Sequence, residues 1–310
     1  MPALRDEHDD PVADLVRPAA EVERALANVV GLPFDTTTLG RRGSRFGPGA
    51  IRAALATCLC YDANFDVDLA DAPRVADHGD VDVIQTRIDE TWDRVSKVVA
   101  VLAGDDAPLV VLGGDHGLTF PVLRGLARTV AGPIGVISID AHHDVRVSQH
   151  GEVSAGVPFR YAMERLDGYV AGRNVVQLGI GGWHNSGVYR RYLRDAGASV
   201  VSARELHRDG VDAHVARALE LAGDGTTGIW LSIDIDAVDA AHAPGTGTPA
   251  VAGLTGHQLL EIAWAFGRHP KALGIDVMEV APEHDLGGMT AHLAASALLT
   301  FLAARHDAAA

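Results

Sequence analysis

SIDAHHDVR, residues 138–146, follows an apolar run that predicts a buried parallel strand over residues 133–139. Side chains two positions apart share one face of a strand, so Asp140, His142 and Asp144 point the same way if the strand continues that far. Two carboxylates and an imidazole that converge at the end of a strand are suitable ligands for a hard or borderline metal ion. The stretch therefore predicts a metal site at the edge of a sheet.

A second stretch repeats this pattern. LSIDIDAVD, residues 231–239, places Asp234 and Asp236 two positions apart behind another apolar run. A buried carboxylate is costly unless a charged partner compensates it. Folding alone does not readily explain two such pairs, and together they predict that the carboxylates of both stretches face bound cations.

A third polar cluster, GGDHG at residues 113–117, also follows an apolar run and contributes His116. The three clusters together supply more carboxylates and imidazoles than one divalent ion needs, and they contain no thiolate. Two ions roughly 3.5–4 Å apart would use the whole set by sharing bridging carboxylates, and the oxygen-rich set favours Mn²⁺ over Zn²⁺. The predicted metal ligands are His116, Asp140, His142, Asp144, Asp234 and Asp236.

Strand and helix patterns alternate along the chain, without a linker-like or low-complexity break. This alternation predicts a single α/β domain over residues 21–310, built on a parallel sheet. Ligands of such sheets bind beyond the carboxyl ends of the strands, which is where the polar clusters fall. The acidic residues 1–20 are predicted to form a mobile or loosely docked arm.

The chain has 310 residues and a formal net charge of −15, from 26 basic and 41 acidic side chains. This charge argues against non-specific binding of nucleic acid and against an anionic membrane surface, although local charge can still favour an anionic small molecule. No apolar run is as long as a membrane span, and the first residues lack the apolar core of a secretory signal. We therefore expect a cytoplasmic protein that acts on a small molecule.

The motifs resemble those of the ureohydrolases, the family of arginases, agmatinases, guanidino-acid amidinohydrolases and formiminoglutamases. The resemblance extends over about residues 27–304 and is carried by GSRFGPGAIR, GGDH, DAHHD, SIDIDAVDAAHAPGTGTP and DVMEVAPEHD, in this order. It implies a three-layer α/β/α fold with a mainly parallel sheet of eight strands. It also implies two Mn²⁺ ions per subunit and a homo-oligomer of three or six subunits.

The resemblance further implies a role for several residues. Asp140 and Asp234 would bridge the two ions, and Asp144 would orient the metal-bound hydroxide. Glu279, in the MEVAP segment, would pair with the amidinium end of the substrate. The family hydrolyses a C–N bond at an amidine or guanidine carbon, which gives urea from a guanidine and formamide from a formimino group.

One position departs from arginases and agmatinases, which carry a histidine before a glycine in the loop that follows DAHxD. Here VSAGVPFR places Ala155 at this position, and an alanine can do no acid–base work. Formiminoglutamases also have a small residue there, and the segment GIGGWHNS, with Asn185, is similar to theirs. His150 and His184 are candidates to replace the missing histidine.

Arg146 and Arg160 are candidates to bind a substrate carboxylate, because a guanidinium can bind a carboxylate through two hydrogen bonds; the alternative for each is a structural ion pair. The favoured substrate is therefore N-formimino-L-glutamate, hydrolysed to glutamate and formamide. The segment APGTGTP, residues 243–249, has instead the form of agmatinases and guanidino-acid amidinohydrolases. An agmatinase or a guanidino-acid hydrolase such as a guanidinobutyrase is thus the alternative, and a non-catalytic metal-binding member of the family is a second one.

Overall fold

The computed structural model describes residues 6–104, 107–148 and 153–309. In this part of the chain nine strands form one sheet in the order β1-β5-β2-β6-β11-β10-β7-β8-β9, and every neighbouring pair is parallel. A short antiparallel pair, β3 (Tyr61–Asp62) with β4 (Val67–Asp68), lies apart from it. The strands of the sheet are β1 (Val16–Pro18), β2 (Asn28–Gly31), β5 (Val75–Asp80), β6 (Leu109–Leu112), β7 (Ile134–Ile139), β8 (Val175–Ile180), β9 (Ser199–Ser202), β10 (Gly228–Asp234) and β11 (Ala272–Met278).

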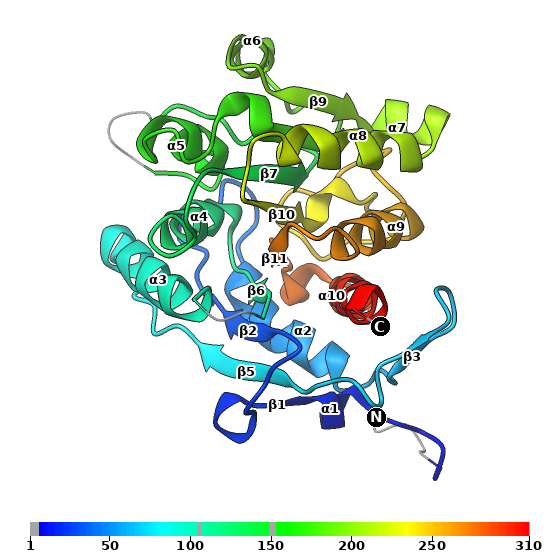
Figure 1. Cartoon of the computed structure of the whole chain (residues 1–310). Helices are drawn as coiled ribbons and strands as arrows, with labels where there is room; N and C mark the ends of the chain where they lie inside the picture. The colour runs from blue at the N-terminus through cyan, green and yellow to red at the C-terminus, as the bar shows by residue number, and fades with distance from the viewer. Residues whose placement is uncertain (1–5, 105–106, 149–152, 310) are drawn as a thin grey trace.

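Helices cover both faces of the sheet and make three layers (Figure 1). The α-helices are α1 (Val12–Leu15), α2 (Gly47–Leu55), α3 (Ile88–Leu102), α4 (Thr119–Leu126), α5 (Pro158–Arg165), α6 (Gly187–Asp195), α7 (Ala203–Asp209), α8 (Asp212–Gly223), α9 (Gly256–Gly267) and α10 (Met289–Ala309). Helices α3, α4 and α5 pack on one face, and α2, α8, α9 and α10 pack on the other, each with its own hydrophobic core. No helix in the described residues is both long and apolar enough to cross a bilayer.

The central strands are apolar because helices cover them on both sides. Every residue of β6, β7 and β10 is buried, as expected for parallel strands between two helical layers. Helix α9 begins after Thr255, whose hydroxyl accepts a hydrogen bond from the Gln258 N–H. These features confirm the predicted arginase-like α/β fold.

The sheet has one strand more than predicted, and part of the predicted arm belongs to it. Val12 and Leu15 are fully buried, and β1 pairs with β5, so residues 12–18 are not a mobile arm. Residues 1–5 of the predicted arm lie outside the described residues. The short length of β1 hides it from pattern analysis, and β5 buries only Val75 and Ala76.

Four neighbouring strands bring the polar motifs together. Strands β6, β11, β10 and β7 are adjacent in the sheet, and GGDH, MEV, DIDAVD and DAHHD lie at their carboxyl ends. The turn after β6 requires glycine, because a Cβ on Gly114 would lie 1.9 Å from the backbone oxygen of Phe34. This close approach places the next residues, including His116, over the edge of the sheet.

Candidate functional site

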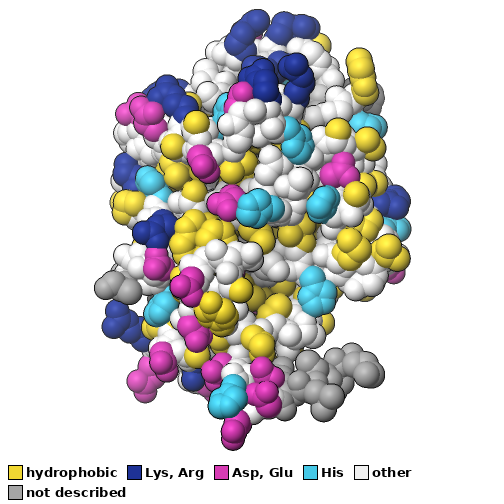
Figure 2. All heavy atoms as spheres, turned by 90° about the vertical axis from the view of Figure 1, so that its right-hand side faces the viewer, with side chains coloured by type: hydrophobic (Ala, Val, Ile, Leu, Met, Phe, Trp, Pro, Cys, Tyr) yellow, Lys and Arg dark blue, Asp and Glu magenta, His cyan; other side chains and the backbone are white. Residues whose placement is uncertain are grey.

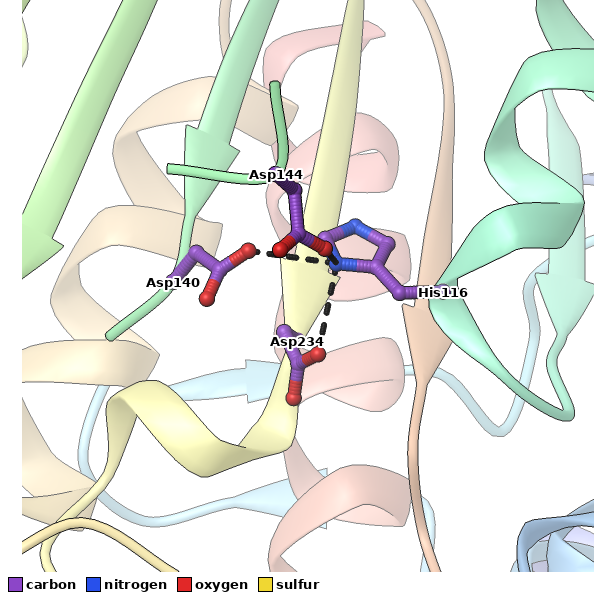
Figure 3. A group of neighbouring side chains, drawn as sticks. All are labelled: His116, Asp140, Asp144 and Asp234. Atoms are coloured by element: carbon purple, nitrogen blue, oxygen red, sulfur yellow. Dashed lines mark ion pairs between the residues drawn. The ribbon is translucent and has the colours of Figure 1, made fainter. Parts of the chain in front are cut away.

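Three of the predicted carboxylate ligands meet at the imidazole of a fourth ligand, His116 (Figure 3). Its Nδ1 lies 3.1 Å from Asp140 Oδ2, 3.0 Å from Asp144 Oδ2 and 3.2 Å from Asp234 Oδ2. The ligand atoms of the four side chains all lie within 4.8 Å of one another. At this spacing one divalent ion could contact all four.

The other two predicted ligands form a second group with Asp140. His142 Nδ1 lies 3.0 Å from Asp236 Oδ2 and 3.5 Å from Asp140 Oδ1. The ligand atoms of this group also lie within 4.8 Å of one another. Asp140 belongs to both groups, with Oδ2 toward His116 and Oδ1 toward His142, so the arrangement could hold two neighbouring ions that share this carboxylate.

Both acidic motifs place their ligands by the same local hydrogen bond. Asp140 Oδ1 accepts a hydrogen bond from the His142 N–H at 2.6 Å, and Asp234 Oδ1 accepts one from the Asp236 N–H at 2.9 Å. Such bonds from an aspartate to the backbone two residues on stabilise a turn. In each motif the first carboxylate therefore turns the chain just after the strand and keeps Oδ2 for the site.

The alternation of side chains along a strand does not explain this grouping, contrary to the prediction. Strand β7 ends at Ile139, so His142 and Asp144 lie in the loop that follows it. Asp144 has a φ of 45°, a left-handed conformation that is uncommon for residues other than glycine. The carboxylate of Asp144 reaches His116 because the loop turns at this residue, not because a strand continues.

The cluster contains an excess of negative charge away from water. Burial raises the pKa of Asp234 well above its usual value, and repulsion from Asp236 raises it further. Burial also raises the pKa of Asp140, helped by repulsion from Asp144. Burial alone would lower the pKa of His142, but its interactions with Asp236 and Asp140 outweigh that effect and raise the pKa to about 12. Burial and mutual repulsion thus raise the pKa of these two carboxyls, and the surrounding negative charge raises the pKa of His142.

Unpaired polar atoms show where a cation would fit. In the described residues His116 Nδ1, Asp140 Oδ2 and Glu279 Oε2 are buried and have no hydrogen-bond partner. Buried polar atoms nearly always have one. Unpaired nitrogen and oxygen ligands that converge are expected around a metal ion, and carboxylates with imidazoles suit a divalent ion such as Mn²⁺.

Glu279 lies directly after β11 and borders the metal-ligand cluster. Its φ of 63° is again left-handed. Its N–H donates to the Gly114 carbonyl oxygen at 2.8 Å, and its Oε1 accepts a hydrogen bond from the His116 N–H at 3.0 Å. Burial raises the pKa of this carboxyl well above its usual value, and repulsion from Asp234 adds to the shift. Because Oε1 is held in place, Oε2 is a fixed acceptor for a cationic group.

A cavity of about 230 Å³ opens beside the cluster. Its walls come from the loop before α2, the loops after β7, β10 and β11, and the segment before α6. The cluster residues His142, Asp144, Asp234, Asp236 and Glu279 line it. A small molecule in this cavity would therefore contact the predicted metal ligands directly.

Arg146 and Ala155 line the cavity as predicted. The Arg146 side chain packs against Gly156, where an added Cβ would lie 2.6 Å from Arg146 Cδ. Its Cζ lies 5.8 Å from the centre of the Tyr189 ring. None of the carboxylates in the described residues forms an ion pair with Arg146, so its guanidinium can bind a ligand.

Asn185 also lines the cavity, but its side chain serves the protein backbone. Its Nδ2 donates to the carbonyl oxygens of Ala141 at 2.8 Å and Gly181 at 2.9 Å, and its Oδ1 accepts from the His143 N–H at 3.0 Å. Both amide protons are thus engaged. The geometry supports a role in holding the loop after β7, in place of the predicted contact with substrate.

The structure does not bring Arg160 to the cavity, contrary to the prediction. On α5 its Nε donates to the Val145 carbonyl oxygen at 2.8 Å, and one terminal nitrogen donates to Glu164 Oε1 at 2.9 Å. Its Cζ lies 3.7 Å from the centre of the Tyr192 ring. The guanidinium is therefore held in the structural ion pair that was the alternative interpretation.

Of the two histidines that could replace the missing loop histidine, the structure describes His184. His184 lines the cavity, with its ring centre 6.2 Å from that of His142, whereas His150 lies outside the described residues.

Sequence reasoning missed Thr248, whose hydroxyl donates to Asp236 Oδ2 at 2.6 Å, and Tyr189 in the cavity wall. Thr248 lies in the APGTGTP segment and could have been found from it, but Tyr189 has no comparable sequence signal.

Acidic residues in pairs at the carboxyl edge of a parallel sheet, with two imidazoles among them, define a metal-binding α/β enzyme. The model of the Arginase family matches residues 25–304, and the chain belongs to this family. It is thereby a hydrolase of C–N bonds in linear amidines, as predicted.

Proteins that are named for different substrates are similar to this chain in sequence or in structure. The mitochondrial agmatinase of Gallus gallus is 37% identical over 280 residues, which covers 89% of this chain and 80% of the relative. The crystal structure of formimidoylglutamase from Bacillus subtilis has a TM-score of 0.91 at 28% identity, over 98% of this chain and 94% of that chain. A variant of the formiminoglutamase of Trypanosoma cruzi, solved with Mn²⁺, has a TM-score of 0.88 at 25% identity, over 96% of this chain and 98% of that chain.

We expect Asp234→Asn to raise the melting temperature of the metal-free protein and to reduce its stabilisation by Mn²⁺. The substitution removes a buried charge that repels Asp236, and a gain of about 1 kcal/mol would appear as roughly 2–4 °C. A ligand at 100 times its Kd stabilises a protein by about 2.7 kcal/mol, which the variant should largely lose. Thermal unfolding with and without Mn²⁺ measures both effects.

Asp71→Asn is the matched control, because Asp71 is exposed. It should leave the melting temperature and the effect of Mn²⁺ unchanged. Equal stabilisation of the wild type and Asp234→Asn by Mn²⁺ would contradict the assignment of Asp234 as a metal ligand.

Proposed function

We propose that this chain is a binuclear Mn²⁺ hydrolase that converts N-formimino-L-glutamate and water into L-glutamate and formamide. The observation that supports this most is the presence, in one cavity, of the Arg146 guanidinium and the unpaired carboxylate oxygen of Glu279. The substrate has the complementary charges: a cationic formimino group, one carboxylate on the carbon that bears its nitrogen, and a second carboxylate at the far end of the side chain. Opposite charges placed in this way favour one substrate over its analogues.

The two metal-ligand groups supply the sites for the ions in this proposal. Two bound divalent cations lower the pKa of a water molecule and so provide a nucleophile at neutral pH. The second group in the structure comprises Asp140, His142 and Asp236, and in this proposal Asp234 would join Asp140 as a ligand shared by both ions. One ion would be held by His116, Asp140, Asp144 and Asp234, and the other by Asp140, His142, Asp234 and Asp236.

The side chains of the cavity bind and orient the substrate. Glu279 Oε2 accepts hydrogen bonds from the formimino N–H groups and holds the formimino carbon beside the cluster. Arg146 binds the carboxylate tail, and Asp144 accepts a hydrogen bond from the attacking water. The water oxygen adds to the formimino carbon, the bond from this carbon to the glutamate nitrogen breaks, and the nitrogen takes up a proton as it leaves.

Positive charge near the cavity also supports an anionic substrate. Figure 2 views the molecule from the right-hand side of Figure 1, and Lys and Arg side chains gather at its top, the end of the molecule where α6 lies. Helix α6 carries Arg190, Arg191 and Arg194. Burial lowers the pKa of His143, a residue of the cavity wall, and the positive charge of Arg190 lowers it further. Helix α6, with three arginines and one aspartate, thus carries a charge opposite in sign to the net charge of −15.

A guanidino acid such as 4-guanidinobutyrate is the second candidate. The APGTGTP segment favours it, as does the 36% identity to the mitochondrial guanidino acid hydrolase of Homo sapiens. Glu279 would accept hydrogen bonds from a guanidinium as it does from a formimino group, and Arg146 would bind the single carboxylate. Agmatine carries an ammonium group in place of the carboxylate, which Arg146 would repel.

We expect N-formimino-L-glutamate to have the highest kcat/KM in a panel with agmatine, arginine, 4-guanidinobutyrate and 3-guanidinopropionate, all with Mn²⁺. Agmatine should be a poor substrate because of charge repulsion. The assay measures formamide and urea release in parallel. Faster urea release from a guanidino compound would overturn the assignment of substrate, and the absence of Mn²⁺-dependent turnover of any compound would favour a non-catalytic member of the family.

Arg146→Ala should lower kcat/KM for N-formimino-L-glutamate by about 10–100-fold, which is the range expected when a charge-assisted hydrogen bond is lost. Most of the loss should appear in KM, since Arg146 contacts the tail and not the reacting carbon. Arg217→Ala is the matched control, because Arg217 is exposed on α8, where it pairs with Glu220, and does not line the cavity. Equal loss in both variants would show that Arg146 does not bind the substrate.

A further inference from the structure

A buried carboxylate that no catalytic role yet explains lies behind His116. Asp276, on β11, is fully buried and forms no ion pair in the described residues. It accepts three hydrogen bonds: from Trp230 Nε1–H at 2.7 Å, from the Ser232 hydroxyl at 2.6 Å and from the Thr119 hydroxyl at 3.1 Å. A buried charge held by neutral donors alone is costly, so its presence requires an explanation.

The strand register fixes the position of this carboxylate. Ser232 on β10 pairs with Asp276 on β11, and Trp230 pairs with Gly274. Residues two apart on a strand share a face, so the indole and the hydroxyl both reach the carboxylate. A Cβ on Gly274 would lie 2.7 Å from Trp230 Cζ3, so the glycine makes room for the indole. Asp276 is therefore held in one orientation against Ser232.

The direction of the hydrogen bonds determines where His116 carries its proton. A serine hydroxyl has a single proton, and Ser232 donates it to Asp276 Oδ1. In its 3.0 Å contact with His116 Nε2, the Ser232 oxygen must therefore accept, and the proton lies on Nε2. The opposite nitrogen, Nδ1, then offers its lone pair to a metal ion among the three carboxylates.

We propose that Asp276 is a positioning residue that acts through Ser232 to keep the proton of His116 on Nε2, and so presents Nδ1 to a divalent ion. This proposal rests on the proposed function in one respect, that His116 is a metal ligand. Partners behind a ligating histidine are known to fix its tautomer and its orientation. Here the partner is a carboxylate one hydroxyl away from the ring.

Asp276→Asn tests the direction of this hydrogen-bond chain with little change of shape. If the new amide nitrogen faces Ser232, it donates to the hydroxyl, which then donates to His116 Nε2 and moves the ring proton to Nδ1. If the amide nitrogen faces Trp230 instead, two N–H donors oppose each other. We expect either orientation to weaken Mn²⁺ binding at the His116 group by about 10–100-fold, with binding at the His142 group retained.

The measurement is Mn²⁺ occupancy of the full-length protein across a range of free Mn²⁺ concentrations, with thermal unfolding in chelator as a second readout. Ser232→Ala removes the link and leaves the Trp230–Asp276 hydrogen bond, so it should also weaken the His116 group; it gives the answer if Asp276→Asn does not fold. Ser138→Ala is the matched control. Ser138 pairs with Ser232 across β7 and β10, and its buried hydroxyl has no hydrogen-bond partner among the described residues.

The outcomes separate this proposal from the metal centre itself. Mn²⁺ binding by Asp276→Asn or Ser232→Ala that equals the wild type would overturn the role of Asp276 and leave the metal centre intact. An equal loss at both ligand groups, with a lower melting temperature in chelator, would show a purely structural role and would also overturn it. A wild-type chain that binds no Mn²⁺ would refute the metal centre, and this proposal with it.

Discussion

Mutual repulsion among buried carboxylates is the constraint on which the structure of the site depends. Five acidic side chains and two imidazoles lie together where water is largely excluded, and the carboxyl pKa values of Asp140, Asp234 and Glu279 are raised accordingly. Hydrogen bonds from the backbone to Asp140 and Asp234 hold the arrangement but do not neutralise it. Divalent cations at this cluster would supply the missing positive charge.

The parallel sheet provides the geometry for this cluster. The four motifs are far apart in the sequence, yet the strands that precede them are neighbours in the order β6-β11-β10-β7. Each of these strands ends in a turn that redirects the chain. Strand β11 is followed by the left-handed residue Glu279, and β6 by the glycines before His116. At the ends of β7 and β10, the side chains of Asp140 and Asp234 stabilise the turn by accepting a backbone hydrogen bond. The rigid strands thus fix the predicted ligands, while the loops around Arg146 form the cavity beside them.

The sequence predicted an α/β domain on a parallel sheet and the grouping of the acidic motifs, because apolar runs that end in polar clusters are a strong local signal. The arginase-like form of this fold was predicted from the resemblance of the motifs to a known family. Sequence reasoning gave the wrong reason for Asp144, since a left-handed turn cannot be inferred from the spacing of side chains. It also misplaced Arg160, whose partner Glu164 is an ordinary surface residue one helical turn away. Asp276 was overlooked because its contacts with Ser232 and Trp230 depend on strand register, which the sequence does not reveal.

The most direct test of the central claim is the position of Mn²⁺ in crystals of the Mn²⁺-loaded protein, located by anomalous scattering. We predict two peaks per chain, roughly 3.5–4 Å apart as in other two-metal hydrolases. One peak should contact His116 Nδ1, the other should contact His142 Nδ1, and Asp140 should contact both. A single peak, or two peaks that Asp140 does not bridge, would contradict the claim that this buried acidic cluster exists to hold a pair of ions.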